Sequence, residues 1–365
     1  MKIGIDAKWF FAGPVSNRVV IRNLLEEILS QNKEDFFYVF LRKSDKKKYF
    51  PFLRENVRTV YVTTFTNAFT NIFILPFYFR NLDLDIVLFQ NFPSPFCKSK
   101  SINYIHDILF LDYPQYFTII ERIYFWPIKF LTRKCDHIIT ISNNEKSRII
   151  KHKLASEEKI TVVYHGVNKK YNPNYSESQR QSIEKKLSLP RKYILYIGRI
   201  NRRKNIETLI RALNQTDEMH LVIVGKKDNQ NIDLMKMIGK LNIQDRVIFT
   251  GHLADNDTPL LYAMANIFCF PSFAEGFGLP PVEAMASGTP VIVSNTTVMP
   301  EICGDACLYF DPKNIGELAS QIKKLTKDED LYSKLKEKGI ERAKSFSWSK
   351  AAHKINLVFQ KIIKQ

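Results

Sequence analysis

The sequence predicts an α/β protein with two parallel sheets, each covered by helices on both faces. Three observations support this prediction. The chain has 365 residues, about twice the length of a typical domain. Short apolar runs alternate with helical stretches, as expected for strands that are buried in parallel sheets. A polar stretch, "NKKYNPNYSESQ" at 168–179, interrupts the alternation near the middle of the chain.

The expected strands form two groups, one on each side of this stretch, which has the Asn, Pro and Ser content of a linker. Each group predicts one Rossmann-like lobe, and we place the first lobe at 1–168 and the second at 169–346. The first group comprises Lys2–Ile5, Phe36–Leu41, Val57–Val62, Ile86–Phe89, Asn103–Ile105, His137–Ile141 and Thr161–Tyr164; the second comprises Tyr193–Ile197, His220–Val224, Arg246–Phe249, Ile267–Phe270, Pro290–Val293 and Cys307–Phe310.

Such an arrangement also predicts where a ligand binds. In open α/β sheets, ligands bind beyond the carboxyl ends of the strands, so two facing lobes create a central cleft between those ends. Residues that directly follow strands are therefore the first candidates for a site.

Composition limits the class of protein. The chain is 45% hydrophobic and 25% charged, which is typical of a folded protein. The cysteines are odd in number and form no C-x-x-C pair, so we expect a reducing compartment and no metal site. The start, "MKIGIDAKWF", carries Asp6 and no apolar core of signal-peptide length, and we expect a cytoplasmic protein. The cysteines are Cys97, Cys135, Cys269, Cys303 and Cys307.

The formal net charge of +17 is spread along the chain. Up to Gly166 there are 24 Lys and Arg against 16 Asp and Glu, and after it 30 against 21. No basic tail or zinc-finger spacing indicates nucleic acid. In Arg42–Arg54 and Tyr116–Lys134, basic residues alternate with aromatic ones, which suits an anionic membrane surface. A solvated basic face over core aromatics explains these stretches equally well, and both interpretations stay open.

Residues Thr59–Phe79 carry no charge and are about long enough to cross a bilayer. They contain five Thr, two Asn and one Pro, however, and these polar residues are costly in a membrane. The segment is better interpreted as a strand, a loop and an amphipathic stretch.

One expected strand end carries a basic motif. The strand "YILYIG" runs into "GRINRRKN", where Gly198 gives access to the backbone and Arg199 and Lys204 follow. This spacing brings both cations to one anion, such as a leaving diphosphate. The alternative is a basic helix start with solvated side chains. Positive charge there opposes the helix dipole, so this alternative leaves Arg202, Arg203 and Lys204 unexplained.

A second candidate is "FAEGFGLPPVEAMASGTPVIVS" at Phe273–Ser294. We expect its helix to start near Pro280, where the two prolines lack N–H groups. The donors that can face an anion are then the loop amides before it, and glycine allows a close approach of the ligand. These loop residues are Gly276, Phe277, Gly278 and Leu279.

The same stretch holds two glutamates. Glu283, expected in the first turn of the helix, can accept hydrogen bonds from ribose hydroxyls, as an acid does in dinucleotide sites. Glu275, in the loop, can hold the hydroxyls of a sugar. Taken alone, Glu283 is explained by stabilisation of the helix dipole and Glu275 as a surface acid.

Together these residues resemble the family 4 retaining glycosyltransferases, which have the GT-B fold. Glu275 and Glu283, with seven residues between them, and the upstream "GRINRRKN" look like the paired signatures of that family. The resemblance covers nearly the whole chain in the expected order. Further matches are "HDILFLDYP" (His106–Pro114), "ITISN" (Ile139–Asn143), "VVYHGVN" (Val162–Asn168), "GHLADNDTPLLYAMANIFCFPS" (Gly251–Ser272) and "PEICGDACLYFDP" (Pro300–Pro312).

The resemblance implies a nucleotide-sugar donor bound mainly by the second lobe and an acceptor bound mainly by the first. Carried over by position, Arg199 and Lys204 hold the donor diphosphate, and Gly198 and the loop amides of 276–279 remain the donor-binding candidates that the residues themselves suggest. Glu283 then holds the ribose and Glu275 the transferred sugar. His106 faces the reacting sugar from the first lobe and orients its hydroxyls.

Two further points come from the resemblance. The segment 347–365 is similar to the closing helix of the family, which packs back on the first lobe. The loop after the first strand, "AKWFFAGPVSNRVV" (Ala7–Val20), departs from the family's glycine-rich loop, because it offers only Gly13 followed by Pro14. Gly13 is the remaining donor-binding candidate of that loop.

The implied reaction retains the anomeric configuration and uses neither a bound metal nor a cofactor apart from a GDP- or UDP-sugar co-substrate. Fixed donors stabilise the charge that grows on the leaving diphosphate. Glu275 and Glu283 are not the acid and nucleophile of a glycosidase, because Glu283 is occupied with ribose.

For the donor, "HDILFLDYP" resembles the form found in mannosyl- and rhamnosyltransferases of bacterial surface polysaccharides, which favours GDP-mannose. For the acceptor, the basic-aromatic stretches favour a lipid-linked saccharide at the cytoplasmic face of a membrane, used in polysaccharide or lipopolysaccharide assembly. Two other classes stay open. One is a UDP-sugar epimerase of the same two-lobed fold, and the other is a non-catalytic basic binding protein, which only the charge favours.

Overall fold

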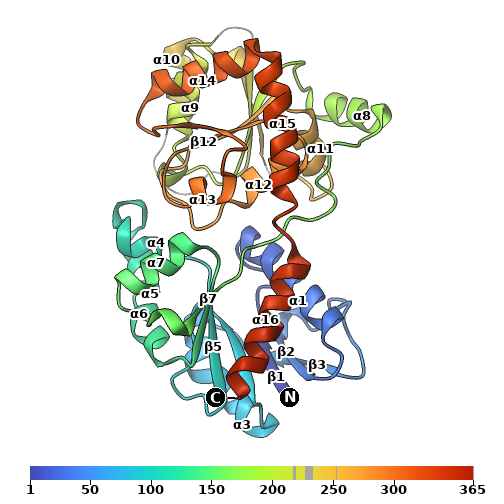
Figure 1. Ribbon diagram of the computed structural model, residues 1–365, viewed down its shortest axis with the longest axis vertical. Coiled ribbons are helices and arrows are strands. Elements are labelled where there is room, and N and C mark those ends of the chain that lie inside the picture. The colour runs from blue at the N-terminus through green and yellow to red at the C-terminus, as the bar shows by residue number, and fades with distance from the viewer. Residues whose placement is uncertain (217–218, 227–232, 252, 365) are drawn as a thin grey trace. The chain divides into compact units, whose positions relative to one another are not determined.

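The computed structural model describes residues 1–216, 219–226, 233–251 and 253–364. The chain divides into two compact units (Figure 1): the first lobe, residues 1–166 and 347–365, and the second lobe, residues 167–346. The expected boundary lies at residue 168. His252 of the motif at 251–272 and Gln365 of the expected closing segment lie outside the described residues.

The first lobe is built on a seven-stranded parallel sheet in the order β3-β2-β1-β4-β5-β6-β7. Each expected strand of this half is present in the described chain. The central strands are buried on both faces apart from Lys100 at the start of β5, which explains their near-continuous apolar runs. The strands are β1 (Lys2–Asp6), β2 (Phe36–Arg42), β3 (Val57–Val62), β4 (Ile86–Gln90), β5 (Lys100–Ile105), β6 (His137–Thr140) and β7 (Ile160–Val162).

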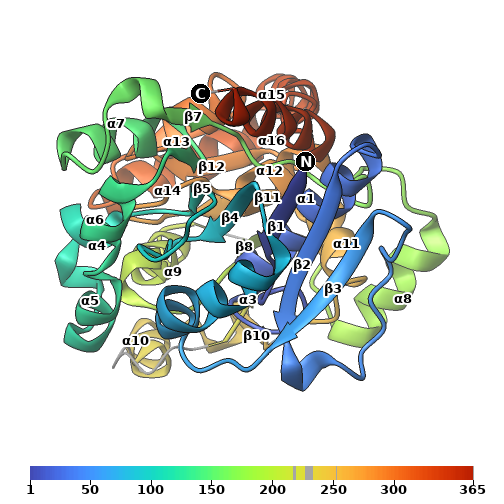
Figure 2. The same cartoon turned by 90° about the horizontal axis from the view of Figure 1, so that it is seen from below.

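Helices cover both faces of this sheet. Because crossover connections are right-handed, the helices that follow β3, β5 and β6 lie on the face opposite to α1. The last long helix, α16, packs against α1 (Figure 2). The helices are α1 (Val15–Gln31), α2 (Asn67–Phe69), the π-helix η2 (Thr70–Ile74), α3 (Leu75–Leu82), α4 (Leu109–Asp112), α5 (Ile119–Phe125), α6 (Ile128–Leu131), α7 (Asn143–Lys151) and α16 (Trp348–Ile363), with 3₁₀ turns η1 (Lys43–Asp45), η3 (Pro114–Tyr116), η4 (Thr132–Lys134) and η5 (Glu157–Lys159).

In the part of the chain that the structure describes, the second lobe repeats the plan with a six-stranded parallel sheet in the order β10-β9-β8-β11-β12-β13. Its strands are β8 (Tyr193–Ile197), β9 (His220–Val224), β10 (Val247–Gly251), β11 (Ile267–Phe270), β12 (Val291–Ser294) and β13 (Leu308–Phe310). Its helices are α8 (Glu177–Leu187), α9 (Ile206–Leu213), α10 (Leu234–Leu241), α11 (Thr258–Met264), α12 (Leu279–Ala286), α13 (Met299–Cys303), α14 (Ile315–Lys327) and α15 (Glu329–Ala343), with 3₁₀ turns η6 (Arg202–Lys204) and η7 (Gln244–Arg246).

The linker is shorter than the sequence predicts. We expected it to continue to Gln179, but α8 already begins at Glu177. Ser176 and Gln179 form a capping box, in which each side chain hydrogen-bonds to the backbone N–H of the other residue. The polar residues at the end of the expected linker are therefore a helix start.

The two chain segments that connect the lobes lie side by side. The Val167 N–H donates to the carbonyl of Phe346 at 3.2 Å. A Cβ atom on Gly166 would lie 2.1 Å from the backbone nitrogen of Trp348, so no other residue fits at this position without a shift of the backbone. A glycine is therefore required where the two segments meet.

The segment Thr59–Phe79 forms β3, a loop and the helical run α2-η2-α3, as predicted. Within the described chain, no helix combines the length and the apolar character that crossing a membrane requires. The five cysteines are free thiols.

Candidate active site

Close backbone packing shapes the end of β8 in the second lobe. The Gly198 N–H donates to the carbonyl of Val224 at 3.0 Å, and a Cβ atom on Gly225 would lie only 1.9 Å from the Gly198 carbonyl oxygen. The Tyr196 hydroxyl then donates to the carbonyl of Arg199 at 2.7 Å. The backbone at Arg199 is thus fixed at the strand end, and its side chain is exposed.

The residues after Arg199 form a tight turn that directs two cations inward. The Asn201 side chain caps η6 by accepting from the Lys204 N–H at 3.1 Å. Asn205, which is buried and has φ of 54°, donates to the carbonyls of Pro271 and Pro312. Lys204 is largely shielded, whereas Arg202 is exposed. The motif is therefore a turn fixed by hydrogen bonds and not a helix start with solvated side chains.

Glu275 is the centre of a buried ion cluster. Lys204 Nζ donates to Glu275 Oε1 at 2.7 Å, and Arg203 Nη1 lies 3.0 Å from the same oxygen. Arg203 also donates to the carbonyl of Ala274, and Lys204 Nζ lies 4.5 Å from the centre of the Phe270 ring. The structure brings together two predicted residues, Lys204 and Glu275, and adds Arg203, which the prediction left without a role.

The cluster fixes the charges of its members. Burial by itself raises the pKa of Glu275, but the charges of Arg203 and Lys204 outweigh this effect and lower it to about 2. Burial lowers the pKa of Lys204 to about 8, although Glu275 opposes the change. At neutral pH Glu275 is an anion held between two cations, so the cluster carries one net positive charge.

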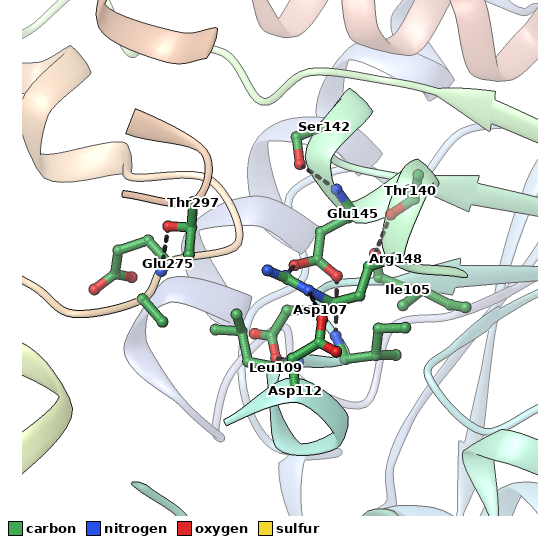
Figure 3. Close-up of polar contacts among 12 residues, drawn as sticks. Ile105, Asp107, Leu109, Asp112, Thr140, Ser142, Glu145, Arg148, Glu275 and Thr297 are labelled. Atoms are coloured by element: carbon green, nitrogen blue, oxygen red, sulfur yellow. Dashed lines mark hydrogen bonds and ion pairs between the residues drawn. The ribbon is translucent and has the colours of Figure 1, made fainter. Parts of the chain in front are cut away.

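A strained residue holds the backbone of Glu275. The Thr297 hydroxyl accepts a hydrogen bond from the Glu275 N–H at 3.1 Å (Figure 3). Thr297 has φ of 51°, a left-handed conformation that is unusual for a β-branched residue. No local sequence signal marks this residue, because its conformation is set by tertiary structure.

The loop after Glu275 enters α12 through Gly278. Its φ is 98°, and a Cβ atom would lie 2.5 Å from Met299 Cε, so glycine is required here. Leu279 is the first residue of α12, whereas we expected it in the loop. The Phe277 side chain is buried against the Phe346 ring, so only its backbone can meet a ligand. Gly276 lies in the loop, as predicted.

The predicted position of Glu283 in the first helical turn is wrong. Because Gly278 caps α12, the first turn ends at Val282 and contains no acid. Stabilisation of the helix dipole therefore does not explain Glu283. Its Oε2 accepts from the Tyr262 hydroxyl at 3.0 Å, and Tyr171 also hydrogen-bonds to it. Burial raises the pKa of Glu283, and the two tyrosines oppose this change.

In the first lobe, His106 directly follows β5, as predicted. Its Nε2 lies 2.8 Å from Gln90 Oε1, and its backbone N–H donates to Asn91 Oδ1 at 3.1 Å. The ring lies 5.6 Å from that of Trp9. Burial lowers the pKa of His106 to about 3, so the imidazole is neutral at physiological pH and acts through hydrogen bonds.

A buried ion network holds the segment after His106 against α7 (Figure 3). Glu145 Oε2 accepts from the Ile108 N–H at 3.1 Å, and Arg148 donates to Glu145. Arg148 Nε also donates to Asp112 Oδ2 at 2.7 Å. The sequence analysis missed this network, although the i, i+3 spacing of Glu145 and Arg148 on a helix is a recognisable signal.

The loop after β1 is filled by its own side chains. Lys8 is buried and pairs with Asp6 and Asn71, and Asn71 also donates to Asp6 Oδ2 at 2.9 Å. A Cβ atom on Gly13 would lie 2.6 Å from the Trp9 ring, and Gly13 has φ of 132°. Packing and backbone conformation thus explain Gly13 without a ligand.

The described residues of the two lobes contain no cluster of three or more His, Cys, Asp or Glu that can hold a metal ion. The second lobe offers an acid fixed between cations, with Arg199 exposed at the neighbouring strand end.

Comparison with known proteins agrees with this geometry. Residues 19–171 match the family model described as Glycosyltransferase Family 4, and residues 178–342 match that of Glycosyl transferases group 1. The O-antigen chain mannosyltransferase RfbU of Salmonella typhimurium is 33% identical over 66% of this chain and 64% of its own length. O-antigen chain mannosyltransferase B of Escherichia coli is 30% identical over 71% of this chain and 69% of its own length.

Solved structures show the same fold. Sucrose-phosphate synthase from Thermosynechococcus elongatus has a TM-score of 0.79 at 21% identity and covers 100% of this chain and 99% of its own. Anabaena Alr3699/HepE in complex with UDP-glucose has a TM-score of 0.78 at 19% identity and covers 99% of this chain and 100% of its own. The two parallel-sheet lobes are those of the GT-B fold, and the chain belongs to the family 4 glycosyltransferases.

Proposed function

We propose that the protein is a retaining, metal-independent hexosyltransferase that moves a sugar from a nucleotide diphosphate to a saccharide acceptor. The observation that carries the proposal is the cluster of Arg203, Lys204 and Glu275 beside Arg199. Membership of the family and the mannosyltransferase activity of its relatives support it.

The cations act on the leaving group. As the bond from the sugar to phosphate breaks, negative charge grows on the diphosphate, and preorganised cations lower the barrier. Lys204 is already fixed by Glu275 and by the Phe270 ring, so little reorganisation is needed during the reaction. Arg199 and the backbone of Gly276 add further donors at the same end of the lobe.

The glutamates bind and do not attack. Glu275 is held by two cations and by the Thr297 hydroxyl, which suits an anion that fixes sugar hydroxyls. Glu283 is kept in place by Tyr262 and Tyr171 and accepts from the ribose hydroxyls. A glycosidase would need one acid as nucleophile and the other as proton donor, and neither environment provides this.

The donor we propose is GDP-mannose, which the mannosyltransferase relatives favour. A structural neighbour was solved with UDP-glucose, so the competing donor is a UDP-sugar. The acceptor is a lipid-linked saccharide of surface polysaccharide assembly, and the enzyme works in the cytoplasm at the membrane surface.

A thermal-shift panel with GDP-mannose, UDP-glucose, GDP and UDP tests the donor, because a ligand that binds the folded state raises its melting temperature. We expect the largest shift with GDP-mannose. The anomeric configuration of the product, determined by NMR after incubation with a lipid-linked acceptor, tests the retaining mechanism. Sugar turnover without any acceptor would instead indicate an epimerase, and the absence of any shift would indicate a protein that does not bind nucleotides.

A further inference from the structure

A row of exposed phenylalanines runs along the helical segment that follows β3 in the first lobe. Consecutive rings are in contact, with centroid distances of 5.5, 5.1 and 6.1 Å from Phe65 to Phe69 to Phe73 to Phe96. The exposed fractions range from 47% to 70%. We call this surface the phenylalanine ridge; it comprises Phe65, Phe69, Phe73, Phe77 and Phe96.

The four-residue spacing shows why the rings share one face. Residues at i and i+4 of a helix lie above one another, so Phe69, Phe73 and Phe77 point the same way along α2-η2-α3. The opposite face of the run carries Leu75 and Phe79, which belong to the core. Large contiguous apolar patches of this kind mark interaction surfaces.

A second apolar surface adjoins the ridge. Five apolar residues on and between α5 and α6 are 44% to 80% exposed, and we call this surface the α5-α6 face; it comprises Ile119, Ile120, Ile123, Trp126 and Phe130. Ala68 of α2 packs against the same core cluster as Tyr124 of α5, and Tyr124 hydrogen-bonds to the backbone at Asn67 and Ala68. The two apolar surfaces therefore belong to neighbouring elements on one face of the sheet.

The charges around these surfaces identify the partner. The segments 65–80, 96–100 and 118–134 contain seven basic residues and one acidic residue, Glu121. A second copy of the chain would bring like charges together. Aromatic side chains with basic residues beside them suit the interface of an anionic bilayer, where each Lys or Arg adds about 1 kcal/mol of attraction.

We propose that the phenylalanine ridge and the α5-α6 face dock the first lobe onto an anionic lipid surface, with the rings in the interfacial layer. The ridge lies outside the basic-aromatic stretches that the sequence analysis singled out. The inference deepens the proposed function, because it names the surface that meets the membrane, and its test does not depend on transferase activity.

The tryptophans provide a direct readout. Trp126 is 58% exposed, whereas Trp9 and Trp348 are buried. On mixing the intact protein with vesicles that contain phosphatidylglycerol, we expect a blue shift of the fluorescence and co-sedimentation. Pure phosphatidylcholine vesicles and high salt are expected to reduce both, because screening weakens the attraction.

The variant Phe73→Glu/Phe77→Glu tests the ridge, with Leu357→Glu as the control. Leu357, on α16, is 49% exposed and matches the 47% of Phe73, but it lies on the other face of the sheet. We expect the double variant to bind vesicles at least about tenfold more weakly, the loss expected when a buried phenylalanine is removed. The control is expected to bind like the wild type. Unchanged melting temperatures show that both variants fold.

Three outcomes overturn the inference: no binding of the wild type to anionic vesicles at low salt, equal binding by the double variant, or a dimer in solution that the double variant abolishes without any vesicle binding. Vesicle binding without sugar transfer would support the inference and contradict the proposed function. Sugar transfer to a soluble acceptor without vesicle binding would support the transferase activity and contradict the inference.

Discussion

Glu275 in the second lobe and Glu145 in the first are both buried acids beside an arginine, yet their pKa values shift in opposite directions. The pKa of Glu275 is lowered to about 2, and that of Glu145 is raised. Burial acts on both in the same sense, because it disfavours the anion. The charges of the neighbouring residues therefore decide the direction of the pKa shift.

The difference is the number of cations for each carboxylate. Glu275 pairs with both Arg203 and Lys204. Glu145 shares Arg148 with Asp112, and the charge of Asp107 further opposes its ionisation. The first cluster is thus a fixed anion with excess positive charge, which suits binding, whereas the second is a structural clamp on the segment after His106.

The largest expected effect comes from breaking the clamp. Arg148→Met leaves Glu145 without its cation, while Asp112 keeps its contacts with Lys151 and His152. Removal of one partner of a buried pair typically costs about 3–5 kcal/mol. We expect a loss of this size in the free energy of unfolding, measured by urea denaturation. Glu145→Gln/Arg148→Met is expected to recover part of it. A loss below about 1 kcal/mol would show that the clamp does not stabilise the lobe.

Removal of Lys204 or Arg199 is expected to slow catalysis. In the proposed mechanism, Lys204→Ala and Arg199→Ala each remove a donor to the leaving group, and such a loss typically costs about 10²- to 10³-fold in rate. The measurement is kcat at saturating donor. Arg202→Ala, an exposed neighbour in the same turn, serves as the control. Near-normal turnover of either variant would remove that residue from the catalytic role.

Substitution of Glu283 is expected to change donor binding and not the chemical step. We expect Glu283→Ala to weaken donor affinity by about ten- to a hundredfold, because a hydrogen bond to a charged group contributes about 1.5–3 kcal/mol. The value of kcat should change little. Tyr262→Phe removes one hydrogen bond to Glu283 and is expected to have a smaller effect in the same direction. Calorimetric titration with donor measures both, and unchanged affinity of Glu283→Ala would rule out the ribose contact.

The smallest expected effect is on the pH dependence of stability, which has opposite signs for the two glutamates. The contribution of Glu275 to stability is present above the ordinary glutamate pKa and is lost as the pH falls toward about 2. The contribution of Glu145 to stability is present below the ordinary glutamate pKa. It is lost as the pH rises through the raised pKa that Glu145 has in the folded protein. Unfolding of Glu275→Gln and Glu145→Gln, compared with the wild type between about pH 3 and 8, should show slopes of opposite sign, at most about 1.4 kcal/mol per pH unit. Parallel curves would contradict the comparison.

The sequence predicts the strands and the strand-end positions of Arg199, Glu275 and His106, because buried parallel strands leave continuous apolar runs and their carboxyl ends follow from topology. The sequence also places Glu283 in the first turn of α12, because the two prolines suggest a helix start near Pro280. The helix starts at Leu279 instead, so Glu283 lies just beyond its first turn. The left-handed Thr297 could not be predicted, because its conformation is fixed by tertiary contacts.

The hydrogen bond between Val167 and Phe346 has a consequence for the architecture of the chain. The second lobe is one continuous segment whose two ends meet, and it is inserted into a first lobe made of two segments. Because the two ends of the second lobe are adjacent, its removal leaves residues 166 and 347 of the first lobe close together. The second lobe therefore has the connectivity of a unit that can be exchanged between related chains, with Gly166 and Trp348 at the junction.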